Sequence, residues 1–200
     1  TGSGAQILSG ASTYAGGTTI GGGRLEVNNT TGSGAGTNTV NVSAGGTLAG
    51  SGTIAGPVNV ASGATLWPGT GTTPGALTLS TNLAFAAGAT FVSRIRGTGP
   101  AEHDMVTAAG SVALNNAALS LDLSGFSPQV GSRFVWLVNN AGSGAVTGTF
   151  NGLAEGATIW IGTVEWQITY QANYATGSTT GGNDVALILT SVFGSTYLMQ

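Results

Sequence analysis

The stretch VNVSAGGTLAGSGTIAGPVNVASGATLW, residues 40–67, contains one unit of sequence twice. VNVSAGGTLA at 40–49 matches VNVASGATLW at 58–67, and looser copies follow as LAFAAGATFV at 83–92 and VALNNAALSL at 112–121. Each copy reads as a short strand with apolar residues at alternate positions, a corner of small residues that usually includes glycine, and a second short strand. A single unit cannot bury its apolar face, so the repeats predict coils that stack on one another and share a continuous core.

An earlier and more glycine-rich copy of the unit is TTIGGGRLEV, residues 18–27. The starts of the later copies, at residues 40, 58, 83 and 112, favour the coils of a parallel β-helix with loops of variable length. An antiparallel sandwich would instead show turn signals roughly every 8–12 residues. The connections NTTGSGAGTN and WPGTGTTPGA, at 29–38 and 67–76, are expected to be loops that project from the coils.

The sequence changes character after about residue 125. Aromatic residues concentrate in RFVWLV at 133–138 and ATIWIGTVEWQITY at 157–170, where Gly162 and Thr163 read as a hairpin turn, and DVALIL at 184–189 reads as a further strand. A solenoid must cover its last coil, since an open end exposes apolar core and unpaired strand edges. The expected organisation is therefore β-solenoid repeats over 1–125, a C-terminal β cap over 126–189 and an apolar tail over 190–200.

Composition narrows the classes of function. Charged residues make up 6% of the chain, lysine is absent and the net charge is −3, so no basic surface is available to neutralise a nucleic-acid backbone. The chain has no cysteine, which excludes disulfides and thiolate metal sites, and no apolar run long enough for a membrane-spanning helix. No signal peptide opens the sequence, and Thr1 begins within the repeat pattern, so we read the chain as a processed product or an excised segment.

The order of these segments resembles a known family. LSGASTYAGGTTIGGGRLEV at 8–27 and GSGTIAGPVNVASGATLWPGTGTTPGALTLSTNLAFAAGATF at 50–91 resemble the passenger-associated repeat of bacterial autotransporters. GFSPQVGSRFVWLV, VTGTFNGLAEGATIW and GGNDVALIL, all after residue 124, resemble the C-terminal end of such passengers, which caps the β-helix and acts as an autochaperone. The resemblance implies an all-β, right-handed parallel β-helix that is secreted or exposed at the cell surface. It also implies an outer-membrane β-barrel of the same precursor as export partner, and it implies no particular activity.

The best candidates for acid–base chemistry are adjacent residues in AEHDM. Alternation along a strand would place Glu102 and Asp104 on one side and His103, the single histidine, on the other, which is unsuited to a dyad with the histidine. We therefore expect a loop or strand-start cluster. Arg94 and Arg96 are two positions apart and are expected to project together from a strand toward solvent.

Tryptophans are the other candidates. Trp136, Trp160 and Trp166 lie in alternating strands of the expected cap, where core packing is the simplest role. Trp67 differs, because it precedes Pro68 at the edge of a loop and replaces a small residue in the family pattern, so an exposed ligand contact is considered for it. A single GGND at 181–184 reads as a turn, since calcium-binding nonapeptides need tandem copies.

The sequence thus predicts a non-catalytic structural β-helix, the stalk and folding cap of an autotransporter-type passenger, with no catalytic, cofactor-binding or metal-binding residue. One alternative is a self-assembling extracellular filament subunit whose tail SVFGSTYLM, residues 191–199, is donated as a strand to the next copy. A further alternative is an adhesin that binds a glycan or host surface, and a carbohydrate-active enzyme is the weakest reading.

Overall fold

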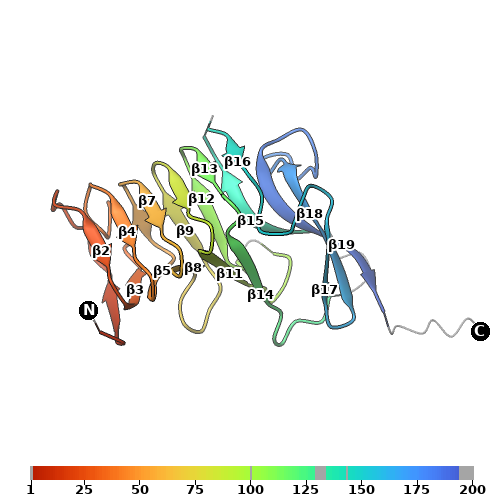
Figure 1. The fold of residues 1–200 in the computed structure, drawn as a ribbon, viewed down its shortest axis with the longest axis horizontal. Coiled ribbons are helices and arrows are strands. Elements are labelled where there is room, and N and C mark those ends of the chain that lie inside the picture. The colour runs from red at the N-terminus through yellow and green to blue at the C-terminus, as the bar shows by residue number, and fades with distance from the viewer. Residues whose placement is uncertain (1, 100, 129–133, 143, 194–200) are drawn as a thin grey trace, which may run out of the picture.

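The structure is a computed structural model that describes residues 2–99, 101–128, 134–142 and 144–193. The described residues form strands joined by turns and loops, without helices, and Figure 1 shows the strands stacked side by side along the long axis of the molecule. The chain is therefore all-β, as predicted.

Three sheets contain all the strands, and we name them A, B and C. Sheet A has the order β1 (Ala5–Leu8), β3 (Gly23–Val27), β5 (Gly46–Gly50), β8 (Thr65–Pro68), β11 (Thr90–Arg94), β14 (Ala118–Asp122). Sheet B has the order β2 (Thr18–Ile20), β4 (Val40–Val42), β7 (Val58–Val60), β10 (Leu83–Phe85), β13 (Val112–Ala113), β16 (Val146–Thr147). Sheet C has the order β6 (Thr53–Ile54), β9 (Ala76–Leu79), β12 (Met105–Ala108), β15 (Phe134–Asn140), β19 (Asp184–Val192), β18 (Val164–Ala172), β17 (Thr158–Ile161).

Successive strands belong to the three sheets in a repeating order. From β4 to β16 the order is B, A, C, and each new strand of a sheet lies beside the previous strand of that sheet. Each strand pairs in parallel with the equivalent strand of the next turn of the chain, in all three sheets. This topology is consistent with a parallel β-helix, and it confirms that each sequence repeat contributes one strand to sheet B and one to sheet A.

Pairing in the ladders matches the alignment of the repeats. Val40 and Val42 pair with Val58 and Val60, which pair in turn with Leu83 and Phe85. Gly45, Gly63 and Gly88 occupy the same corner of three successive units, each with φ between 73° and 81°, a left-handed conformation that glycine adopts without strain. In the fourth unit the corner is built by Asn115 and Asn116, both with positive φ, which asparagine tolerates better than most residues.

The core is made of columns of inward-facing side chains, one from each turn of the chain. Leu25, Leu48, Leu66 and Phe91 form one such column in sheet A, and all four are buried. The ring of Phe91 contacts Phe85 edge-on at 6.2 Å and stacks on Phe150 at 5.9 Å, measured between centroids. The outward residues are polar ladders, such as Asn41 and Asn59, whose side-chain amides are hydrogen-bonded at 3.1 Å. Burial alternates along the short strands β4, β7 and β10 and along β8 and β9, which places apolar side chains inside and polar ones such as Asn41 and Asn59 outside.

After Thr147 the pairing becomes antiparallel. β17 and β18 form a hairpin whose turn contains Gly162 with φ of 61°, as predicted, and β19 pairs antiparallel with both β18 and β15. Trp166 of β18 is fully buried against the core. The parallel ladders extend through β15 and β16, so the change in pairing comes later in the chain than the predicted division at 125/126, which stays a prediction.

The predicted apolar tail overlaps this antiparallel region. Ser191 and Val192 are paired with β18 as part of β19, so these two residues are already engaged in a sheet. The remainder of the proposed donor strand, from residue 194 onward, lies outside the described residues.

Candidate functional site

A cluster of polar side chains surrounds Trp67, near the end of β8. Its indole nitrogen donates a hydrogen bond to Asp104 Oδ2 at 3.1 Å. The guanidinium carbons of Arg24 and Arg94 each lie over the ring, 4.9 Å from its centroid, and come from strands on either side of β8 in sheet A. Trp67 is therefore a half-buried member of a cation–π cluster, and contacts within the chain take the place of the exposed ligand contact that was considered for it.

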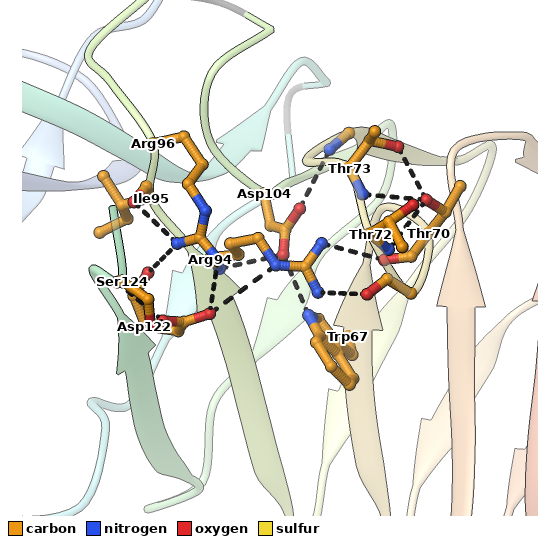
Figure 2. A network of polar contacts seen from close by, with 12 residues as sticks. Trp67, Thr70, Thr72, Thr73, Arg94, Ile95, Arg96, Asp104, Asp122 and Ser124 are labelled. Carbon is orange, nitrogen blue, oxygen red and sulfur yellow. Dashed lines mark hydrogen bonds and ion pairs between the residues drawn. The ribbon is translucent and has the colours of Figure 1, made fainter. Parts of the chain in front are cut away.

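Asp104 is the centre of this cluster and is completely buried. Besides the indole, its Oδ2 accepts the backbone N–H of Arg94 at 2.9 Å, and its Oδ1 accepts the backbone N–H of Gly75 at 3.0 Å. The three donors belong to three different segments, so one carboxylate fastens β8, β11 and the loop 69–75 together (Figure 2).

Arg94 fixes the same loop from the other side. Its Nη1 and Nη2 donate to the carbonyl oxygens of Thr70 and Gly71, at 3.1 and 3.2 Å (Figure 2). The residue is only 3% exposed, because the guanidinium lies between the indole and the loop. The prediction that Arg94 decorates a solvent face is therefore wrong: alternation identified the outer face of the strand, but the loop covers that face.

Arg96 and Arg94 converge on Asp122, the last residue of β14. The Asp122 Oδ2 lies 2.9 Å from Arg96 Nη2 and 3.8 Å from Arg94 Nε, and Ser124 donates to Oδ1 from both its hydroxyl and its backbone N–H. The two arginines thus share one carboxylate, although Arg96 lies beyond the end of β11 rather than on the same strand as Arg94.

A second ion pair, between Arg24 and Glu26, belongs to the same cluster, because Arg24 lies over the ring of Trp67. Arg24 Nη2 lies 2.8 Å from Glu26 Oε1, and the same oxygen accepts the backbone N–H of Gly71 at 3.2 Å. Sequence reasoning missed Arg24, Glu26 and Asp122. The available signal was the spacing of two between Arg24 and Glu26 in a strand pattern, which places both on one face, but only the sheet register brings Trp67 beside them.

Burial shifts the pKa of two adjacent residues in opposite directions. Desolvation raises the pKa of Asp104 to about 6, against the N–H donors of Arg94 and Gly75 and the charge of Arg94. Desolvation lowers the pKa of His103 to about 4, so the ring is neutral at pH 7. The hydrogen bond from Arg96 holds the pKa of Asp122 well below its usual range.

The three adjacent candidates of AEHDM have separate environments. Glu102 is exposed and accepts the backbone N–H of Gly99 at 2.8 Å, whereas Asp104 is buried, so the expected pairing of the two carboxylates on one side does not occur. His103 is 1% exposed, and its Nε2 accepts the backbone N–H of Trp136 at 3.3 Å. The expectation of a strand-start cluster is confirmed, because Asp104 directly precedes β12.

The tryptophans of the C-terminal region divide into two groups. Trp166 and Trp136 are buried, as predicted for core packing. Trp160 is 52% exposed, so the same prediction for Trp160 is wrong: it lies on the outer face of the hairpin, 5.3 Å from the ring of Phe193. GGND forms a turn ahead of β19, and its Asp184 carboxylate accepts the backbone N–H groups of Asn140 and Tyr174.

The cluster around Asp104 fastens the loop 69–75 to the coil. Its carboxylates and arginines are hydrogen-bonded to one another or to backbone groups, and Arg24 also lines a hollow beside β1 and β2. Within the described residues, no group of three or more His, Cys, Asp or Glu side chains is placed to hold a metal ion. The same residues contain no helix long and apolar enough to cross a membrane.

Comparison with known proteins gives one similarity. The sequence model of the passenger-associated-transport-repeat family matches residues 1–27, the segment that contains β1, β2 and β3. The match supports a repeat of the autotransporter passenger type at the start of the chain. No curated protein and no solved structure matches the chain.

Proposed function

We propose that this chain is a non-catalytic structural element, the stalk and folding cap of an autotransporter-type passenger that is secreted or exposed at the bacterial surface. It would present a functional region that lies N-terminal to it. The observation that carries the proposal is the set of three parallel ladders, which run from β1 to β14 in sheet A, from β2 to β16 in sheet B and from β6 to β15 in sheet C. The repeat match over residues 1–27 supports the autotransporter assignment.

The ladders favour a stiff rod. Each turn of the chain is hydrogen-bonded to the turns before and after it along three sides, and the apolar columns stack without interruption. Such an arrangement resists sharp bending, because a sharp bend would distort the hydrogen bonds of at least one sheet. We take the coil to be a right-handed parallel β-helix over the repeats, with the C-terminal antiparallel strands as its cap.

The cap assignment rests on what the last strands cover. Phe150 is fully buried and stacks on Phe91, and Trp166 contributes its indole to the same core. Without them, the last aromatic side chains of the coil would face water. A cap of this kind prevents coil ends from pairing with one another and provides a nucleus for folding after export.

The test compares two truncated chains by light scattering and negative-stain electron microscopy. Removing residues 126–189 should give a product that aggregates or is degraded by protease, because the end of the core is exposed. Truncation after Phe193 is the matched control, since it keeps every described strand, and it should give monodisperse short rods. A soluble, protease-resistant product from the first deletion would reject the folding-cap role.

One observation favours the filament alternative as a second candidate. β17 is the terminal strand of sheet C, and its Trp160 and the neighbouring Phe193 are 52% and 59% exposed, an aromatic pair on the outside of the molecule. Fibres of regular width from the full chain, lost on truncation after Phe193, would replace the stalk by a polymer subunit. The adhesin alternative had Trp67 as its candidate contact to a glycan, and the ring of Trp67 is instead in contact with the guanidinium groups of Arg24 and Arg94.

A further inference from the structure

Sheet A ends at β14, whereas sheets B and C both contain strands that come later in the chain. β14 pairs with β11 on one side, and it is the terminal strand of the sheet. The chain returns to this edge once, where the backbone N–H of Asn151 donates to the carbonyl of Ala117 at 2.8 Å, and then turns away between Phe150 and Leu153. The place of the next rung beside β14 is therefore not taken by a strand of the described chain.

A hollow lies between β14 and β17. A cavity of about 170 Å³ is lined by Leu119 and Leu121 of β14, Leu153, and Ile159 and Ile161 of β17. A second hollow of about 250 Å³ shares Ile161 and extends past Leu123 and Phe126 to Val192. We call the two together the β14 groove.

On both sides of the β14 groove lies a strand with one edge that no described strand pairs with. Among the described residues, β14 is the last strand of sheet A, and β17 is the last strand of sheet C, where it pairs with β18. In parallel ladders alternate residues direct their N–H and C=O groups to opposite neighbours. Ala118 and Asp122 are bonded toward β11, through Ala118 N–H to Ala89 O and Ile95 N–H to Asp122 O, so the backbone groups of Leu119 and Leu121 are directed to the groove side.

We propose that the β14 groove is a binding site for one extended, uncharged peptide strand of a separate polypeptide, which adds to sheet A parallel to β14. Every pair in sheet A is parallel and in register, so a parallel strand continues the established ladder. The incoming strand satisfies the backbone groups of Leu119 and Leu121, and its alternate side chains enter the apolar hollow.

The charges around the groove determine the chemistry of the strand. The residues that line the two cavities include no ionisable side chain, and the carboxylate at the end of β14, Asp122, is already paired with Arg96. A charged side chain that entered the hollow would lose its hydration without gaining a partner. Small or aliphatic residues at alternate positions are therefore required, as in the strands of the coil itself.

The direction of the chain argues for a separate polypeptide. Val192, at the end of β19, lines the groove beside Leu123 and Phe126, which follow β14. A strand that entered directly from Val192 would run from the end of β14 toward its start, opposite to every pair in sheet A. A parallel strand must enter beside Ala118.

Hydrogen exchange of the β14 backbone tests the proposal. The probe is the blocked peptide Gly-Ala-Thr-Leu-Trp, which copies residues 63–67 around the start of β8, added to the full chain. Binding should slow exchange of the Leu119 and Leu121 amides, which face the groove, by about tenfold or more at saturation, and should change that of Ala118, already bonded to β11, much less. The same peptide with lysine in place of leucine should give no protection. In the protein, Ile161→Asp should abolish protection, whereas Ile7→Asp, at the exposed face of β1, should leave it unchanged.

Each other result counts against the proposal. Absence of protection by the leucine peptide, or equal protection by the lysine peptide, would reject a strand-binding groove, and neither readout depends on a variant that must fold. Protection in the peptide-free chain that disappears on truncation after Phe193 would mean that the chain fills its own groove. Protection that rises with protein concentration alone would mean that a second copy fills it.

Discussion

The indole of Trp67 donates a hydrogen bond to Asp104 at 3.1 Å, although 37 residues separate them along the chain. Trp67 ends a strand of sheet A, and Asp104 directly precedes a strand of sheet C. The contact therefore joins two sides of the coil outside its apolar core. Because the same carboxylate holds the loop 69–75 through Gly75, one buried acid determines how this loop lies against the coil.

Replacing this acid should destabilise the protein. In Asp104→Asn one carboxylate oxygen becomes an NH2 group that faces N–H donors, so a charge-assisted acceptor is lost and a donor is left unpaired. We expect the free energy of unfolding at pH 7 to fall by about 1–3 kcal/mol, measured by urea denaturation followed by tryptophan fluorescence. The matched control is Glu102→Gln, two residues earlier and exposed, which should change stability by less than about 0.5 kcal/mol. Equal effects of the two variants would contradict a structural role for the buried acid.

Acidification should weaken the fold through His103. Burial lowers the pKa of His103 in the folded protein from 6.5 to about 4, so between these pH values the unfolded chain binds a proton that the folded chain does not. Stability from this residue is therefore present above pH 6.5 and is lost as the pH falls toward 4. The difference in unfolding free energy between the wild type and His103→Gln should shrink over this range. A difference that does not change with pH would mean that His103 has the same pKa in the folded and unfolded chain.

Asp104 has the opposite effect on the free energy of unfolding as the pH falls. Its pKa is raised from 3.8 to about 6, so the folded protein binds a proton more readily than the unfolded chain, and stability from this group increases as the pH falls from 6 to 3.8. In the Asp104→Asn background the loss of stability on acidification should therefore be steeper than in the wild type. Parallel pH profiles of the two proteins would show that Asp104 titrates normally. Denaturation midpoints at a series of pH values provide the measurement.

The end of the core should depend on one aromatic ring. Phe150 is fully buried and stacked on Phe91, so Phe150→Ala removes a large apolar side chain and leaves a cavity under the C-terminal strands. We expect a loss of about 3–5 kcal/mol in unfolding free energy. Phe193→Ala is the control, because Phe193 is 59% exposed, and it should have little effect. A small effect of Phe150→Ala would show that the antiparallel strands do not seal the core.

Close approach of neighbouring turns should make one glycine irreplaceable. A Cβ atom on Gly56, in the connection between β6 and β7, would lie 1.9 Å from the carbonyl oxygen of Asn38. Gly56→Ala must therefore separate two turns of backbone, and we expect a loss of about 2–3 kcal/mol or more, or an insoluble product. Gly16→Ala meets no atom within 4 Å and should fold normally. Thermal unfolding of both variants distinguishes packing from a general effect of replacing glycine.

Much of the fold could be predicted from the sequence, because short-range patterns determine it. Alternation in VNV and LAF fixes which side chains face inward, and the glycine at each corner fixes where one strand ends. The hairpin at Gly162 was predicted for the same reason, since its turn and both strands are contiguous. The candidate site was less predictable. The placement of Trp67, Arg94 and Asp104 depends on three segments that only the register of the coil brings together.

The sequence by itself determined the repeating unit, the parallel stacking and the polar exterior, since each follows from alternation and from the small residues that allow a corner. Only the tertiary structure decided that Arg94 is buried, that Trp160 is exposed and that sheet A ends at β14 beside an apolar hollow. The physical reason is the range of the interactions involved. Alternation acts between neighbours in the chain, whereas loop contacts, the edges of sheets and the packing of the last strands depend on how distant turns meet.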